Sequence, residues 1–401
     1  VVAKPSARGG PGVLDLVAGP HGASARRGVT LAGATLPLFG AKRGSGCTGA
    51  WWLVGPLAWT CSDLALLSRE PEPDRAATPT ASEAIARDYF FVRTPATAGY
   101  DSLEAAQERE ADRELEAGWG VAVVEQRTAG DERWARTTKG IWIAARDLVP
   151  ARASTFHGEP LPEGKLDVAW VRADRARVWS SPARTASRTD APRDMLVRFQ
   201  VVHVREEAGP FWRISDESAG AAEQWVLGAD LARPTIGAPP AEVTRPRSRW
   251  IDVELASQTL VAYVGERPVY ATIVSTGRGS AAQAREAPPE VNARTGTATP
   301  RGVHHVWVKL LGSDMSDVAR DDTDAHYSLD EVPYVQFFDN AVALHGTYWH
   351  GDFGREHSHG CVNLAPKDAR WLFDFTGPRL PTGWAAAYPS AVDEGTLVRV
   401  R

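Results

Sequence analysis

The amino-acid sequence predicts a mainly β protein in which three small β-barrels precede a larger β-rich domain with a helix near its end. Three observations predict this class. Tryptophans recur in three similar segments before residue 250, hydrophobic and polar residues alternate after it as in strands, and 401 residues exceed what one hydrophobic core usually organises. Several domains are therefore expected.

The three tryptophan-containing segments share one ending, in which Trp, a short gap and Asp-Leu follow each other. The endings are Trp59…Asp63-Leu64, Trp142-Ile143…Asp147-Leu148 and Trp225-Val226…Asp230-Leu231. Two strands, the second carrying the Trp that closes a small barrel, would explain each unit. The pattern resembles bacterial SH3-like domains, which implies units at residues 20–70, 85–160 and 161–240. Such domains often bind peptidoglycan peptides; the alternative is that these Trp side chains only fill three small cores.

Linker-like segments and helix-ending residues in the sequence predict the boundaries between these units. Residues 71–84 are rich in Pro, Thr and charge, as expected of a linker. Ser102 before Leu103 and Gly118 after Ala117 predict an exposed helix over 103–117, inserted in the second unit. Pro234 to Arg249 separates the repeats from the domain that follows.

The C-terminal domain, residues 249–401, begins with hydrophobic residues at every second position. Ile251, Val253 and Leu255 predict a strand, and residues 259–264 and 269–274 predict a hairpin around a Gly-Glu turn. Pro366 suits the first turn of a helix that would continue to about Phe373, and residues 396–400 close as a strand.

Charge and hydropathy argue against a nucleic-acid partner and against a membrane-spanning helix. With 45 Lys+Arg against 50 Asp+Glu, the chain lacks the basic excess that nucleic-acid binding needs. No stretch reaches the roughly 18 apolar residues of a membrane-spanning helix. The first residue is Val1 rather than Met, so we expect that a secretion signal or a lipid anchor has been trimmed upstream.

The three cysteines divide into a close pair and a distant single residue. Cys47 and Cys61 suggest a disulfide, and two buried thiols are the alternative. A disulfide would fit an oxidising, extracytoplasmic location and leave Cys361 outside it.

Four of the ten histidines, His345, His350, His357 and His359, lie just before Cys361. A cysteine nucleophile needs a neighbouring imidazole that takes its proton, and that imidazole needs an orienting partner. Gly360 lets the chain bend before the nucleophile, so the N–H groups of Gly360 and Cys361 are expected to face an oxyanion, with the following helix adding positive potential.

The motif His345-Gly346-Thr347 followed by Ser358-His359-Gly360-Cys361-Val362-Asn363 resembles the signature of the L,D-transpeptidase (YkuD-type) family. The resemblance covers about residues 249–401 and includes Thr299-Pro300-Arg301-Gly302 and the strand at the C-terminus. It implies Cys361 as nucleophile, His345 as base and then acid, and the Gly346 carbonyl as the group that orients His345.

The resemblance also implies roles for the neighbouring residues. Ser358 and His359 would shape the pocket, while Asn363 would hold the Cys loop or the donor peptide. The sequence leaves open whether His345 or His359 is the main base. Further candidates for substrate contact are Trp349, Tyr348, Tyr334 and His350.

The implied reaction is acyl transfer on peptidoglycan stem peptides. The thiolate would release D-Ala, form a thioester and pass the acyl group to an amine of a neighbouring stem. Water as acceptor would give an L,D-carboxypeptidase, and a protein amine would give a protein-to-wall ligase. We expect no metal, no organic cofactor, no nucleic-acid partner, and a monomer in the periplasm or cell envelope.

Four other classes of site or protein fit parts of this pattern. A zinc site formed by the four histidines and Cys361 lacks the usual ligand spacing. Hydrolases of the papain or NlpC type need a His after the Cys, whereas none follows Cys361. A sortase-like enzyme needs a longer His-to-Cys separation and a downstream Arg, for which Arg370 is the candidate. A non-enzymatic wall-binding protein is the last alternative.

Overall fold

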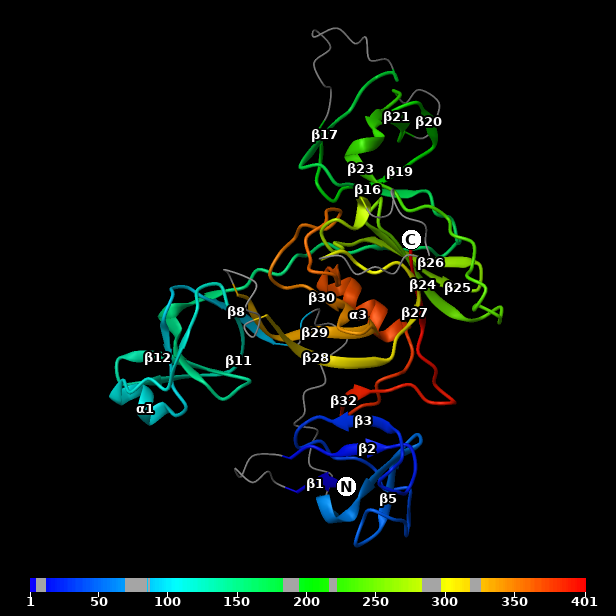
Figure 1. The fold of residues 1–401 in the computed structure, drawn as a ribbon. Coiled ribbons are helices and arrows are strands. Elements are labelled where there is room, and N and C mark those ends of the chain that lie inside the picture. The colour runs from blue at the N-terminus through cyan, green and yellow to red at the C-terminus, as the bar shows by residue number, and fades with distance from the viewer. Residues whose placement is uncertain are drawn as a thin grey trace.

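The computed structural model describes residues 1–4, 12–68, 85, 87–182, 195–215, 222–282, 297–317 and 326–401. Figure 1 shows three lobes around a central region: a blue lobe below it, a cyan lobe beside it and a green lobe above it. Strands predominate in the described residues, so the predicted mainly β class is confirmed. The predicted linker at residues 71–84 lies outside the described residues.

The first lobe is held to the central region by strand pairing. Its strands are β1 (Val2–Ala3), β2 (Asp15–Val17), β3 (Arg26–Thr30), β4 (Gly40–Lys42), β5 (Trp51–Gly55), β6 (Ala58–Cys61) and β7 (Ala65–Leu66). Strand β3 pairs antiparallel with β32 (Trp384–Ala387) of the central region. The buried Trp384 packs into the core of this lobe, which joins the two units by apolar burial as well.

The second lobe contains the predicted inserted helix, but the helix is shorter than predicted. Its elements are β8 (Asp88–Val92), β9 (Thr97–Gly99), α1 (Leu103–Glu108), β10 (Arg113–Leu115), β11 (Gly120–Ala129), β12 (Glu132–Thr137), β13 (Trp142–Ala144) and β14 (Leu148–Pro150). Ser102 caps α1 as expected, yet Arg109 adopts a left-handed conformation (φ 61°) that ends it. Burial of Leu115 in the core of the lobe then favours a strand paired with β9.

The third lobe has eight short strands among its described residues. They are β16 (Val168–Val171), β17 (Arg175–Arg177), β18 (Met195–Val197), β19 (Val201–His203), β20 (Glu206–Ala208), β21 (Phe211–Arg213), β22 (Trp225–Leu227) and β23 (Leu231–Ala232). Its core is formed by aliphatic side chains from strands at the start and at the end of the lobe's sequence, including Val171 and Val226.

The sequence repeat corresponds to a structural repeat. Each lobe ends in a strand, a 3₁₀ turn and a short strand, and the turns are η1 (Ser62–Leu64), η2 (Ala145–Asp147) and η3 (Gly228–Asp230). The repeat tryptophans Trp59, Trp142 and Trp225 are all buried. Three lobes with one common ending follow from this, while the SH3-like resemblance and the unit boundaries stay predictions.

The central region is built mainly from strands. They are β24 (Arg249–Glu254), β25 (Thr259–Val264), β26 (Arg267–Ile273), β27 (Gly302–His305), β28 (Val308–Ser316), β29 (Ser328–Asp339), β30 (Val342–Gly346), β31 (Val362–Leu364), β32 and β33 (Leu397–Val400), with α3 (Pro366–Phe375) after β31. One sheet has the order β15 (Glu159–Pro160), β26, β25, β24, β33, β27. Strands β28 to β32 belong to a second sheet that continues into the first and second lobes.

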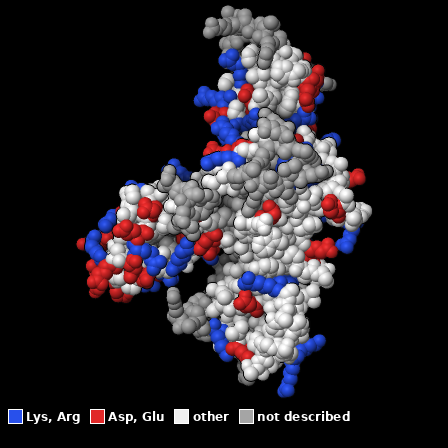
Figure 2. Space-filling model, in the orientation of Figure 1, with Lys and Arg blue, Asp and Glu red and all other residues white. Residues whose placement is uncertain are grey.

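The predicted elements of this region are present. Residues Ile251, Val253 and Leu255 are fully buried in the main core, and α3 starts at Pro366 and buries Leu372 and Phe373 there. None of the helices in the described part of the chain is long and apolar enough to cross a membrane. On the face shown in Figure 2, acidic and basic side chains are interspersed over the second lobe rather than separated by sign.

Candidate active site

Cys361 lies directly before β31, on the wall of a cavity of about 870 Å³. The cavity brings together most of the predicted site residues. The members that line it are His345, Trp349, Ser358, His359, Gly360, Cys361 and Asn363. Residues separated in the motif by a twelve-residue stretch therefore meet at one site.

Parallel pairing of β30 with β31 explains how His345 and Cys361 approach each other. In this register His345 is opposite Asn363. Side chains two residues apart on an extended chain point to the same side, so Cys361, Asn363 and His345 share one face. Strand β30 lies between β29 and β31, and Asn363 of β31 also exchanges two backbone hydrogen bonds with Ser275, so this arrangement is fixed from both sides.

The environment of His345 makes its imidazole a proton acceptor. Its side chain is 2% exposed, and Nδ1 lies 3.1 Å from the carbonyl oxygen of Gly346. Because a carbonyl can only accept, Nδ1 carries the proton and Nε2 keeps a lone pair. Burial lowers the pKa of His345 to about 4, so the ring is neutral at neutral pH. Trp349 stacks on it with ring centroids 5.6 Å apart.

The loop before Cys361 is held by hydroxyl side chains. Gly360 has φ +127°, a conformation that an L side chain rarely adopts. The Ser358 hydroxyl accepts from the Gly360 N–H (3.1 Å) and donates to the Cys361 carbonyl (2.5 Å), while the Thr299 hydroxyl donates to the Gly360 carbonyl (2.8 Å). The loop is thus fixed by one hydroxyl within it and by one from a distant segment of the chain.

Two expectations about this loop are corrected by the structure. The Gly360 N–H is bound by Ser358, so it does not face a developing oxyanion. Strand β31 also separates Cys361 from the start of α3 at Pro366. At about 3.3 Å per extended residue the helix N-terminus lies too far from the thiol for its dipole to act, since that effect is confined to the first turn.

Asn363, which lines the cavity, forms a hydrogen-bonded pair with His350. His350 Nδ1 accepts from the Asp352 N–H (3.1 Å), so the proton of the neutral ring is on Nε2. Burial lowers the pKa of His350 to about 3, which favours that neutral ring. Nε2 lies 2.8 Å from the amide nitrogen of Asn363, and the Asn363 Oδ1 is buried without a partner in the described residues. Turning the amide by half a turn pairs Oδ1 with the Nε2–H and removes the conflict.

A small cluster of possible metal ligands adjoins this pair. Side chains of His350, Asp352 and His357 offer ligand atoms within 4.8 Å of one another, and the two imidazole centroids are 4.0 Å apart. Both ring nitrogens of His350 are already engaged by Asp352 and Asn363. A metal ion would have to displace one of them, so we interpret the cluster as a hydrogen-bonded one.

Three predicted substrate contacts are not on the cavity wall. Tyr334 is fully buried and packs on Phe373 of α3, with ring centroids 5.6 Å apart. Tyr348 is buried against Tyr89 of the second lobe, and the half-buried His350 is engaged by Asp352 and Asn363. Their aromatic character reflects packing between strands and lobes instead of ligand contact.

The structure also shows cavity residues that the sequence did not indicate. Arg278 follows the Ser-Thr-Gly segment that comes after β26, and its backbone N–H donates to the Ser358 carbonyl at 3.1 Å. The second lobe contributes Phe91 and Gly118. The Ser-Thr-Gly segment was a usable signal for Arg278, whereas no local signal places the second lobe here.

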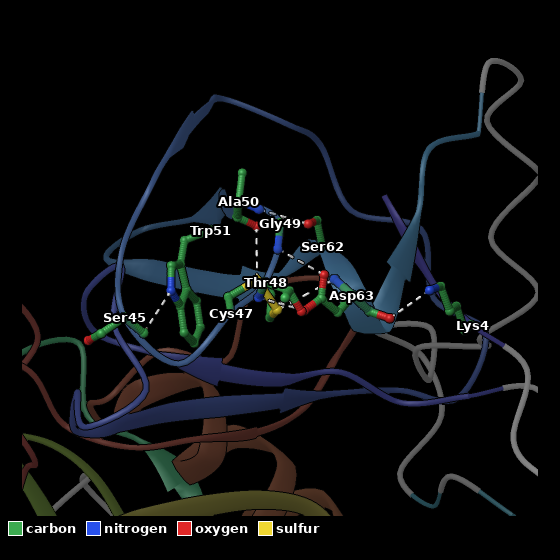
Figure 3. Close-up of a disulfide and its surroundings, with 10 residues drawn as sticks. Lys4, Ser45, Cys47, Thr48, Gly49, Ala50, Trp51, Ser62 and Asp63 are labelled. Carbon is green, nitrogen blue, oxygen red and sulfur yellow. Dashed lines mark hydrogen bonds between the residues drawn. A yellow bond between two sulfur atoms is a disulfide. The ribbon is translucent and has the colours of Figure 1, made fainter.

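The other two cysteines form a disulfide in the first lobe, far from this cavity in the fold. Figure 3 shows the Cys47–Cys61 bond and the turn beside it. The Asp63 carboxylate accepts from the hydroxyl and N–H of Thr48 and from the N–H of Gly49. These hydrogen bonds hold the pKa of Asp63 below its usual value, and the bond from the Thr48 hydroxyl has the largest effect.

The cavity thus combines a buried His that has an oriented ring with a Cys on a tight glycine loop. Residues 248–400 match the family model of the L,D-transpeptidase catalytic domain, YkuD. This region therefore carries that catalytic domain, and the resemblance predicted for residues 249–401 is confirmed. The SH3-like resemblance of the lobes stays a prediction.

Solved structures similar to the chain include several L,D-transpeptidases. One from Stackebrandtia nassauensis is 24% identical over 39% of this chain and 57% of that chain, with a TM-score of 0.24. The catalytic domain from Enterococcus faecium is 23% identical over 39% and 98%, with a TM-score of 0.28. One from Mycobacterium smegmatis is 15% identical over 70% and 99%, with a TM-score of 0.28.

The chain spans less than two thirds of the first two similar structures, namely 57% and 62% of their lengths. No curated protein matches it.

Proposed function

We propose that the protein is a peptidoglycan L,D-transpeptidase that uses a Cys361 thioester. The observation that carries the proposal is the match of residues 248–400 to the catalytic-domain family, with every chemically reactive position of the motif lining one cavity. The donor would be a stem tetrapeptide ending in D-Ala. Such a substrate implies work outside the cytoplasm, in the periplasm or cell envelope.

The first half-reaction forms the thioester. His345 Nε2 takes the proton of the Cys361 thiol, and the thiolate attacks the carbonyl carbon of the amide before D-Ala. The imidazolium then gives its proton to the leaving nitrogen, the C–N bond breaks and D-Ala departs. The Gly346 carbonyl, which accepts from Nδ1, favours the imidazolium in this step.

The second half-reaction resolves the thioester. An amine of a neighbouring stem attacks the carbonyl carbon, passes a proton to His345 and displaces the Cys361 thiolate. Water in place of the amine gives carboxypeptidase activity, and an amine on another protein gives attachment to the wall.

Asn363 is proposed to help hold the donor. With its Oδ1 paired to His350, its NH₂ group takes the buried amide position that has no partner in the described residues, so it can donate to a bound donor that reaches it. Arg278 adds a positive charge at the same cavity, suited to a peptide carboxylate. His359 is exposed and stacks on Tyr327, so it fits a role in shaping the rim better than a role as the base.

The test is intact mass after incubation with a carbapenem, comparing the wild type with Cys361→Ala. We expect one covalent adduct on the wild type and none on the variant, followed by D-Ala release from a tetrapeptide donor by the wild type alone. Two outcomes would contradict the proposal: no adduct on a wild type whose thiol still titrates, or an adduct that persists in Cys361→Ala. The first would favour a non-enzymatic wall-binding protein.

A further inference from the structure

The second lobe reaches the cavity that contains Cys361, although it precedes the catalytic domain by about a hundred residues of chain. Phe91 of β8 and Gly118 line that cavity together with His345 and Cys361. Figure 1 shows β8 beside β29, where the cyan lobe meets the central region. The first and third lobes contribute no described residue to this cavity.

The lobe is fixed in this position by an aromatic stack. The ring of Tyr89 lies on Tyr348, with centroids 3.9 Å apart and planes at 15°. The Tyr89 hydroxyl donates to the Glu331 carbonyl (2.6 Å), and the Tyr348 hydroxyl donates to the Asp330 carbonyl (3.2 Å). Both tyrosines are buried, so the contact excludes water and behaves as a core instead of a loose domain interface.

Charge and backbone contacts add to this attachment. Lys139 of the lobe pairs with Asp330 (2.5 Å) and with Asp314 (3.4 Å), and Asp314 itself lines the cavity. Gly120 pairs with Leu329 of β29. A Cβ on Gly120 would lie 2.5 Å from the Tyr348 hydroxyl, so only glycine permits this close approach.

The turn that presents Gly118 is also ordered by backbone hydrogen bonds. Its N–H donates to the Val92 carbonyl (2.8 Å), and the Val92 N–H donates to the Trp119 carbonyl (2.9 Å). This pair of bonds ties the turn to the end of β8, next to Phe91. The lobe therefore presents a rigid surface to the cavity.

The surface that the lobe completes is apolar. Phe91 belongs to a packed cluster with Met315, Leu329 and Phe337 of the central region, and Cys361 packs against the same cluster. Polar lining residues such as Arg278 and His357 come from other segments. A peptide bound at Cys361 would thus meet a hydrophobic wall built partly by the second lobe.

We propose that Phe91 is a substrate-contacting residue and that the second lobe is a working part of the active site, binding an aliphatic segment of the acyl donor. The identity of the acyl donor in this proposal rests on the proposed function. The position of the apolar cavity wall beside Cys361 is independent of the proposed function. The two can therefore be tested separately.

The first experiment measures access to Cys361 without any substrate. Cys361 is the one cysteine outside the disulfide, so a thiol reagent reports on it alone. Rates are measured with iodoacetamide and with a bulky dye maleimide on the full chain, for the wild type, Phe91→Ala and Val149→Ala. Val149 is the matched control because it pairs with Phe91 across β14 and β8, is 40% exposed and does not line the cavity.

Phe91→Ala is expected to raise the ratio of bulky to small reagent rates about fivefold, and Phe91→Trp to lower it, while Val149→Ala stays within about twofold of the wild type. Phe91→Leu, which keeps an apolar side chain, should restore most of the wild-type ratio and shows that the alanine variant acts locally. Equal ratios for Phe91→Ala and the wild type would contradict the proposal that Phe91 limits access to Cys361.

The second experiment measures D-Ala release from a tetrapeptide donor. Phe91→Ala is expected to raise KM about tenfold, equivalent to about 1.4 kcal/mol, with little change in kcat and no change for Val149→Ala. A wild type that is not acylated and does not release D-Ala would refute the proposed function. The ratio of reagent rates would still test whether Phe91 forms the cavity wall. Normal turnover with an unchanged KM in Phe91→Ala would refute the substrate contact alone.

Discussion

The turn that carries Cys47 and the loop that carries Cys361 are stabilised in different ways. The Cys47 turn combines a disulfide to Cys61 with an exposed carboxylate, Asp63, that accepts three hydrogen bonds. The Cys361 loop has no covalent crosslink and depends on the hydroxyls of Ser358 and Thr299.

The difference follows from what each sulfur atom does. A sulfur used as a crosslink can stabilise a small lobe with a modest core, because it limits the entropy of the unfolded chain. A sulfur that must react has to face a cavity, so other groups must hold its backbone. The four predictions below test this division, from the largest expected effect on Cys361 reactivity to the smallest.

Replacing the proposed base should have the largest effect. His345→Gln removes the Nε2 lone pair, so acylation of Cys361 by a carbapenem should slow by about 10²–10⁴-fold. Stopped-flow or time-resolved mass spectrometry measures the rate. His359→Gln is the matched control, because His359 is exposed and stacks on Tyr327. A larger loss in His359→Gln than in His345→Gln would exchange the two roles.

Loosening the loop should have a smaller effect. Thr299→Val removes the hydroxyl that donates to the Gly360 carbonyl and accepts from the Gly277 N–H (2.9 Å). We expect acylation to slow about tenfold because the thiol is misplaced, and stability to fall by about 1–3 kcal/mol because a buried N–H loses its partner. Thr297→Val, whose hydroxyl binds the Arg278 carbonyl, should change the rate much less. Equal effects of the two variants would contradict a specific role of Thr299.

How much of this site was predictable depends on the sequence distance of the contacts. Cys361, His345 and Gly360 could be found because one motif contains them and a parallel strand pair closes the gap. The repeat of the lobes could be found because Trp and Asp-Leu recur at their ends. Elements β24 to β26 and the start of α3 followed from local periodicity.

The errors arose where long-range packing decides. Tyr348 adjoins the base in sequence, yet it is buried because Tyr89, more than 250 residues earlier, covers it. Phe91 reaches the cavity for the same reason, and neither contact leaves a local pattern in the sequence. The helix predicted over 103–117 ended early because the core of the lobe required Leu115 in a strand.

The acid dependence of the reaction should be weak. Burial lowers the pKa of His345 to about 4, so the base stays neutral between pH 5 and 7 and the acylation rate should vary less than about threefold. A base with the ordinary His pKa of about 6.5 would instead lose about twentyfold over that range. The rate is measured against pH with a Cys361 labelling control. The same shift means that the stabilising contribution of neutral His345 is complete above about pH 6.5 and is lost as pH falls toward 4.

Removing the disulfide should affect stability and leave the chemistry unchanged. Cys47 and Cys61 are 14 residues apart, and a loop of this size corresponds to about 3 kcal/mol on unfolding. In the double variant Cys47→Ser, Cys61→Ser the first lobe should therefore unfold at a lower denaturant concentration than in the wild type. Trp fluorescence measures this unfolding. Acylation of Cys361 should stay within about twofold of the wild type, since the first lobe contributes no described residue to the cavity. A marked loss of acylation would mean that the β3–β32 pairing couples the lobe to the active site. The two cysteine environments would then not be independent.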